Sequence, residues 1–133
     1  MSQRAVAMKH EADPKQEILD KLGDLSRLSI MHNRVLVATY IRPEKTKGGL
    51  ILIEQTRDED QWQGKVGLVV AKGPRAFKDD EQAKFHGQDV KPGDWVYYHP
   101  HDGKQLTING VHCRLFAYET QIIGILTDPD AVW

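Results

Sequence analysis

The chain has 133 residues, of which 40% are apolar and 28% are charged, and its net charge is −1. This length suits one globular domain, and the balanced charge disfavours a dedicated nucleic-acid binder, which would carry a basic excess. No window approaches the roughly 18 consecutive apolar residues of a membrane span, and the polar N-terminus lacks a signal-peptide pattern. The single cysteine, Cys113, excludes an internal disulfide. We therefore expect a small soluble protein of the cytoplasm.

The first predicted element is an amphipathic helix over residues 14–28. Asp13 followed by a proline is typical of a helix start, because the carboxylate accepts free amide hydrogens and proline suits the first helical position. Gly23 weakens the helix by about 1 kcal/mol relative to alanine, so packing must help to hold it. Two roles stay open, a cover for the domain's own core or a contact with a neighbouring subunit or partner. The apolar residues at helical spacing are Ile18, Leu22 and Leu25.

After residue 29 the pattern changes to short apolar or alternating runs separated by glycine and proline. Such runs predict strands, and the Asn109-Gly110 dipeptide between two of them predicts a tight hairpin. Several short strands of this kind favour a small all-β barrel or sandwich. The predicted strands cover residues 34–41, 65–72, 94–99, 105–108, 111–117 and 121–126.

Two segments are too long for ordinary hairpin loops. Residues 42–64 contain the apolar run Leu50-Ile51-Leu52-Ile53, bracketed by two glycines and an acidic stretch. Loops of this length are usually functional or disordered. The run could be a buried strand, or it could be a loop that offers its apolar side chains to another protein. Residues 74–92 form a second, mostly polar excursion, whose apolar points are Phe77 and Phe85.

The chain resembles the GroES-type co-chaperonins over about residues 30–126. The resemblance rests on the order of short motifs. The first motif is a strand that begins with His32-Asn33-Arg34-Val35. It is followed by a long loop with Gly48-Gly49 and three aliphatic residues, and then by a strand that begins with Gly64-Lys65-Val66. Residues 90–96 (VKPGDWV) and the closing strands also match in position. The resemblance implies a partly open β-barrel that assembles into a ring, sevenfold in the family, and caps a bacterial chaperonin double ring. It implies no enzyme activity, no cofactor and no metal.

By position, the resemblance also implies site residues. Its mobile loop, which inserts an aliphatic triplet into the chaperonin, corresponds to Gly48, Gly49, Leu50, Ile51 and Leu52. Residues 74–92 correspond to the roof over the folding cavity. The expected organisation is thus an N-terminal extension (1–29), a barrel (30–126) and a C-terminal tail (127–133).

The departures from the family suggest a second interpretation. The N-terminal extension and the tail ending in Trp133 are extra, the loop has an acidic flank with Trp62, and the roof segment is longer. Enlarged barrels of this kind resemble those encoded by bacterial viruses, whose folding client is often a capsid protein. The alternative is a virion protein on the same barrel, a capsid decoration or connector-associated component. In either case Ile18, Leu22, Leu25 and Trp133 are candidate contacts with other subunits.

Three other chemistries are weaker. A metal site could use His99, His101 and Asp102 with His86 or His112, but the intervening Pro100 restricts convergence of the first two imidazoles. Thiol catalysis by Cys113 lacks a base, because the adjacent His112 would point to the opposite face of a strand. A stacking face for single-stranded nucleic acid could be formed by basic residues together with the aromatic residues Trp62, Trp95, Tyr97 and Tyr98. A core role for Trp95 and Tyr97 and an interface role for the other aromatics is simpler. We expect none of the three.

Overall fold

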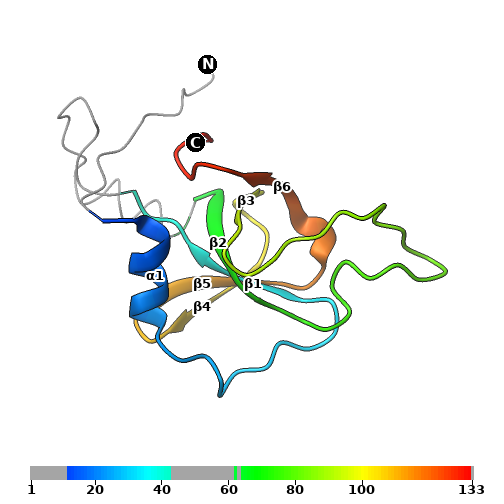
Figure 1. Ribbon diagram of the computed structural model, residues 1–133, viewed down its shortest axis with the longest axis horizontal. Coiled ribbons are helices and arrows are strands. Elements are labelled where there is room, and N and C mark those ends of the chain that lie inside the picture. Colours follow the sequence, from blue (N-terminus) through cyan, green and yellow to red (C-terminus); the bar gives the residue numbers. More distant parts are fainter. Residues whose placement is uncertain (1–11, 43–61, 63, 133) are drawn as a thin grey trace.

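The computed structural model describes residues 12–42, 62 and 64–132 (Figure 1). All six predicted strands are confirmed, each within two residues of the predicted bounds. They are β1 (Val35–Thr39), β2 (Val66–Lys72), β3 (Trp95–Tyr98), β4 (Lys104–Ile108), β5 (Val111–Phe116) and β6 (Ile122–Leu126). They are accompanied by α1 (Pro14–Leu22) and by a 3-10 turn, η1 (Glu119–Gln121).

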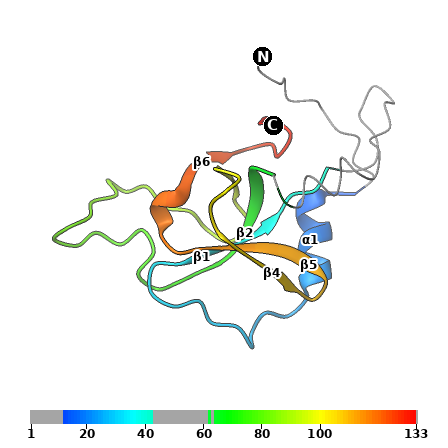
Figure 2. The same cartoon turned by 180° about the vertical axis from the view of Figure 1, so that it is seen from behind.

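The strands form one antiparallel sheet in the order β4-β5-β1-β2-β3-β6. Strands β4 and β6 lie at its two ends, and no pairing among the described residues joins them. The sheet curls round on itself, as the two opposite views show (Figures 1 and 2), and it encloses a cluster of buried apolar side chains. The predicted small, partly open β-barrel is therefore confirmed.

Alternation along the strands divides the buried residues between two faces of the sheet. The interior is filled by side chains such as Val37, Val69, Val96 and Phe116. The outer face carries Leu36, Ala38 and Cys113 on one side, and Tyr40, Leu68 and Trp95 on the other. Both faces are thus apolar, so the outer face also needs a cover.

Helix α1 and the C-terminal residues supply that cover. Leu22 is 1% exposed and packs with Leu36 and Cys113. On the other side of the same face, the Tyr40 hydroxyl donates to Asp130 Oδ1 at 2.5 Å, and Val132 packs against the Trp95 cluster. Of the two roles considered for the helix, covering the chain's own core is the one that the structure shows.

The helix ends at Leu22 rather than at the predicted residue 28. Its start is as expected, because Asp13 Oδ1 accepts the amide hydrogen of Lys15. Gly23 then adopts a positive φ of 65°, which favours glycine, and donates its N–H to the carbonyl of Leu19. The side chain of Asn109 donates to the Leu22 carbonyl at 2.5 Å. The helix end is therefore fixed partly by the β4–β5 hairpin, far away in the sequence.

That hairpin is the one predicted from Asn109-Gly110. Both residues have positive φ, 50° and 80°, as the tight turn requires. It holds β4 and β5 in register from Ile108↔Val111 to Lys104↔Leu115.

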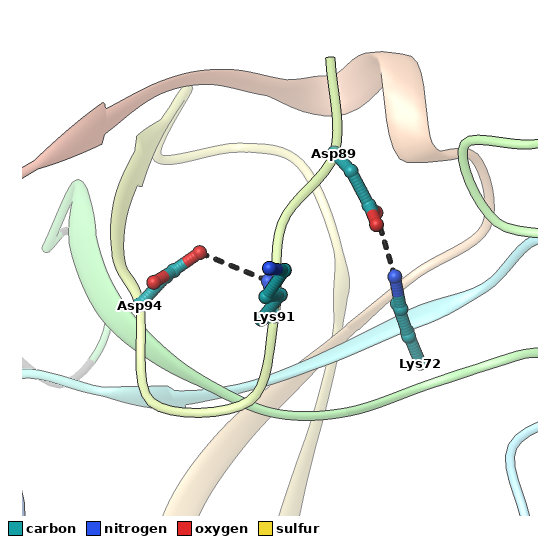
Figure 3. A network of polar contacts seen from close by, with 4 residues as sticks. All are labelled: Lys72, Asp89, Lys91 and Asp94. Carbon is teal, nitrogen blue, oxygen red and sulfur yellow. Dashed lines mark hydrogen bonds and ion pairs between the residues drawn. The ribbon is translucent and has the colours of Figure 1, made fainter. Parts of the chain in front are cut away.

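Residues 74–92 project from the barrel as a long excursion (Figure 1). Its base is tied to β2 by an ion pair between Lys72 Nζ and Asp89 Oδ1 at 2.6 Å (Figure 3). Beside it, Asp94 Oδ2 accepts the amide hydrogen of Lys91 at 2.9 Å and closes the turn that leads into β3 (Figure 3). Further out, the rings of Phe77 and Phe85 pack edge to face at 5.6 Å. The excursion therefore has a fixed base and an internal apolar contact.

Candidate functional site

The predicted partner-binding residues Gly48, Gly49, Leu50, Ile51 and Leu52 lie outside the described residues, but the strands on either side of them are placed. Thr39 of β1 pairs with Gly67 of β2, and the amide of Tyr40 donates to the carbonyl of Val66 at 2.9 Å. The chain that carries the aliphatic run therefore leaves the sheet and returns to it at neighbouring positions.

Trp62 lies close to the return point and is held by two contacts with β5. Its carbonyl accepts a hydrogen bond from Arg114 Nη2 at 2.7 Å. Its ring packs edge to face on the ring of His112, with centroids 5.4 Å apart. The side chain is still 55% exposed. These contacts fix the chain at residue 62 without burying the indole.

Arg114 is a charged residue with no exposed surface. Its Nη1 donates to the carbonyls of Pro100 and Asp102, and its guanidinium carbon lies 5.4 Å from the centre of the Tyr98 ring. Burial lowers the pKa of Arg114, and the neighbouring Tyr98 and Asp102 act in the opposite direction. One guanidinium thus joins the turn after β3 to the main chain at Trp62.

His112 is also buried, and both of its ring nitrogens are engaged. Nδ1 lies 2.8 Å from Thr39 Oγ1, and Nε2 lies 3.1 Å from Gln105 Oε1. Because Oε1 can only accept, a neutral ring in this arrangement carries its proton on Nε2 and accepts the Thr39 hydroxyl at Nδ1. Burial and the charge of Arg114 lower the pKa of His112, which favours that neutral form.

Sequence reasoning missed the roles of Arg114 and His112. The spacing could have indicated their burial, because His112 and Arg114 lie four and two residues before the core residue Phe116 and so share its face of the strand. An arginine in an apolar strand is ordinarily expected to face solvent, and the carbonyls that accept hydrogen bonds from Nη1 and Nη2 of this one come from distant parts of the chain.

The helix residues predicted as partner contacts differ in how deeply they are buried. Leu22 is taken up by the chain's own core, whereas Ile18 and Leu25 are only partly buried beside it. Contact of Ile18 and Leu25 with a partner stays a prediction. Trp133 lies outside the described residues.

Strand β6 carries an exposed apolar surface that the sequence analysis did not single out. Ile123 is 58% and Ile125 is 53% exposed, on the terminal strand of the sheet. The signal was the uninterrupted apolar run of the strand, which is typical of a strand covered on both faces. An exposed edge of this kind is a ready template for another chain.

The weaker chemistries find no support in the geometry. No group of three His, Cys, Asp or Glu side chains in the described residues could hold a metal, although the rings of His99 and His101 lie 5.2 Å apart. Burial raises the pKa of the Cys113 thiol to about 11, so it is not an activated nucleophile. Trp95 and Tyr98 belong to the core rather than to a stacking face. Within the described ranges, no helix is long and apolar enough to cross a bilayer.

Comparison with known proteins identifies the barrel. The family model described as the chaperonin 10 Kd subunit (Cpn10) matches residues 27–126. Co-chaperonin GroES of Dinoroseobacter shibae is 37% identical over 101 residues, which cover 76% of this chain and 91% of that protein. Co-chaperonin GroES of Methylobacterium radiotolerans is 36% identical over 96 residues (72% and 93%), and that of Cereibacter sphaeroides is 40% identical over 97 residues (73% and 95%).

The match spans every strand and leaves out α1 and the residues after β6. These three relatives are named as co-chaperonins of bacteria, so an origin in a bacterial virus stays a prediction. Proteins of this family are co-chaperonins and not enzymes, and the same role follows for this chain. It belongs to the chaperonin 10 Kd subunit family, that of the GroES-type co-chaperonins.

Proposed function

We propose that this chain forms a ring that caps a bacterial chaperonin in the cytoplasm and binds it through Gly48, Gly49, Leu50, Ile51 and Leu52. The observation that supports the proposal is the pairing of β1 with β2, which brings Tyr40 and Val66, the residues on either side of the segment that contains the aliphatic run, to neighbouring positions. A segment whose two flanking residues lie side by side on a barrel suits a lid that binds a partner through a loop.

The energetics suit a lid that must also be released. Burying each of Leu50, Ile51 and Leu52 is worth roughly 1.5–3 kcal/mol. Ordering a segment on binding costs about 1–2 kcal/mol per residue, which offsets most of that gain. A single subunit should therefore bind weakly. Several subunits on one ring raise the apparent affinity by about 10²–10⁴ through effective concentration.

The ring itself is supported by the exposed terminal strand. Ile123 and Ile125 place two large aliphatic side chains on a sheet edge, where contact with another subunit would remove them from water. We propose that β6 is one side of the contact between subunits.

The decisive experiment is size-exclusion chromatography with light scattering, on the protein mixed with a bacterial chaperonin with and without nucleotide. Co-elution should require nucleotide and should disappear when Leu50, Ile51 and Leu52 are all replaced by serine. A matched control replaces the exposed Glu81, Gln82 and Lys84 by serine in the other excursion, and it should still co-elute. A ring that ignores the chaperonin under every nucleotide condition would contradict the proposal.

The client, the protein that this lid would help to fold, is the subject of a separate proposal. We propose a bulky capsid protein, on the ground that the N-terminal extension and the 74–92 excursion enlarge the barrel. The test is a refolding assay with a bacterial chaperonin, which compares this chain with a bacterial GroES on a phage capsid protein and on a bacterial client. Equal yields from the two lids on both clients would contradict a capsid specialisation.

The virion alternative has no observation in its favour, since the matched relatives are named as co-chaperonins.

A further inference from the structure

Strand β5 carries a small docking site that holds the chain at Trp62. We define this Trp62 seat by two residues that contact Trp62, His112 and Arg114. Both side chains are buried, with exposures of 7% and 0%. The Trp62 side chain is 55% exposed, so it rests on the surface of the barrel and is not part of the core.

The Arg114 half of the seat is held in place independently of Trp62. Nη1 donates to two carbonyls of the turn after β3, those of Pro100 and Asp102. Gly103, in the same turn, lies so close that an added Cβ would be 3.1 Å from the Arg114 Cβ. The planar guanidinium is therefore oriented before Nη2 reaches the Trp62 carbonyl, and it presents a donor at a fixed point.

The His112 half is equally constrained. Hydrogen bonds at both ring nitrogens, to Thr39 and to Gln105, prevent the imidazole from turning. The indole of Trp62 then meets a rigid ring in the edge-to-face geometry that aromatic pairs prefer. A polar contact to the main chain and a ring contact to the side chain together define both the position and the direction of residue 62.

We propose that His112 and Arg114 are positioning residues, which seat Trp62 and so fix the point where the partner-binding excursion returns to the barrel. This inference rests on the proposed function, because that function gives the excursion a partner. A seated Trp62 means that Trp62, Gly64 and Lys65 are held in place before binding. Without the seat, binding would have to order them, and affinity would fall.

The test compares Trp62→Ala with Trp62→Phe and with Leu19→Ala, a control at a 37% exposed apolar residue on α1. In the free protein, NMR follows amide exchange at Gly64 and Lys65 and the titration of the His112 ring. Trp62→Ala should speed the exchange about tenfold or more and move the His112 titration toward higher pH, because the ring loses its cover. Trp62→Phe should restore both in part, and Leu19→Ala should change neither. If Trp62→Ala changes neither, the seat is empty in solution and the proposal is wrong.

Chaperonin affinity is then measured with nucleotide present. Trp62→Ala should weaken binding about tenfold while its melting temperature stays near that of the parent, because the residue is largely exposed. Unchanged affinity together with altered exchange would overturn the positioning role. If the parent protein fails to bind at all, the proposed function fails instead, and the free-protein measurements still decide whether Trp62 is seated.

Discussion

At the scale of single residues, the interior of this barrel holds a charged side chain, Arg114, whose removal from water costs free energy. A buried guanidinium is expensive unless each donor finds an acceptor. The carbonyls of Trp62, Pro100 and Asp102 accept hydrogen bonds from Nη1 and Nη2 of Arg114, whereas its Nε has no hydrogen-bond partner in the described part of the chain. Burial of the His112 ring, and then the charge of the neighbouring Arg114, lower the pKa of His112 and so favour its neutral form.

This arrangement predicts a loss of stability in mild acid. The pKa of His112 is lower in the folded protein than its ordinary value of 6.5, so the unfolded chain binds the proton more tightly. The free energy of unfolding should therefore fall as the pH drops below about 6.5, and level off below the pKa of the folded protein. Well above pH 6.5, the titration of His112 should no longer change the free energy of unfolding. Urea unfolding at a series of pH values, at one protomer concentration, measures the fall.

Two variants separate His112 from the other titrating groups. His112→Gln removes the ionisation, and its stability should change less between pH 7 and pH 5 than that of the parent. His101→Gln removes an exposed histidine and keeps the buried one, so the parent's fall should persist. Equal falls in the parent and in His112→Gln would show that burial of this ring does not oppose its protonation.

At the scale of elements, α1 is a short helix that depends on one residue for its packing. Leu22 is its only fully buried side chain, and it closes the outer apolar cluster over Leu36 and Cys113. Leu22→Ala should destabilise the protein by about 2–3 kcal/mol, at the lower end for a buried leucine because a surface helix can settle into part of the space. Leu19→Ala, on the exposed side of the same helix, should cost less than about 0.5 kcal/mol. Equal stabilities of the two variants would mean that the helix is undocked in solution.

The elements also show what local sequence can and cannot predict. The strands were predictable because alternation, glycine and proline are local signals, and Asn109-Gly110 defined its hairpin without help from the rest of the fold. The end of α1 was not predictable from apolar spacing, because Gly23 terminates it and Asn109 caps it from another element. The burial of Arg114 was also not predictable from local sequence, because the carbonyls that accept its hydrogen bonds lie 12, 14 and 52 residues away.

At the scale of the whole molecule, a ring requires each subunit to offer two different surfaces, one for each neighbour. We propose that strand β6 supplies one of them through the exposed Ile123 and Ile125. The apolar residues before β1 are exposed as well, Leu28 by 38% and Met31 by 58%, and they are the candidates for the other. We predict that Ile123→Lys with Ile125→Lys yields a folded monomer, because both side chains are more than half exposed and belong to none of the buried apolar clusters of the described residues. Light scattering gives the mass, and circular dichroism checks the fold.

A mixing experiment tests the two-surface argument directly. Met31→Lys should also yield monomers, because it places a charge in the second surface. Mixed in equal amounts, the β6 variant and the Met31→Lys variant have one intact surface each, and these two surfaces are complementary. They should therefore form a dimer of the two variants and nothing larger, since both outer surfaces of that dimer are blocked. If instead each surface pairs with its own copy, the β6 variant alone should dimerise through the intact residues around Met31, and the heterologous ring contact would be wrong.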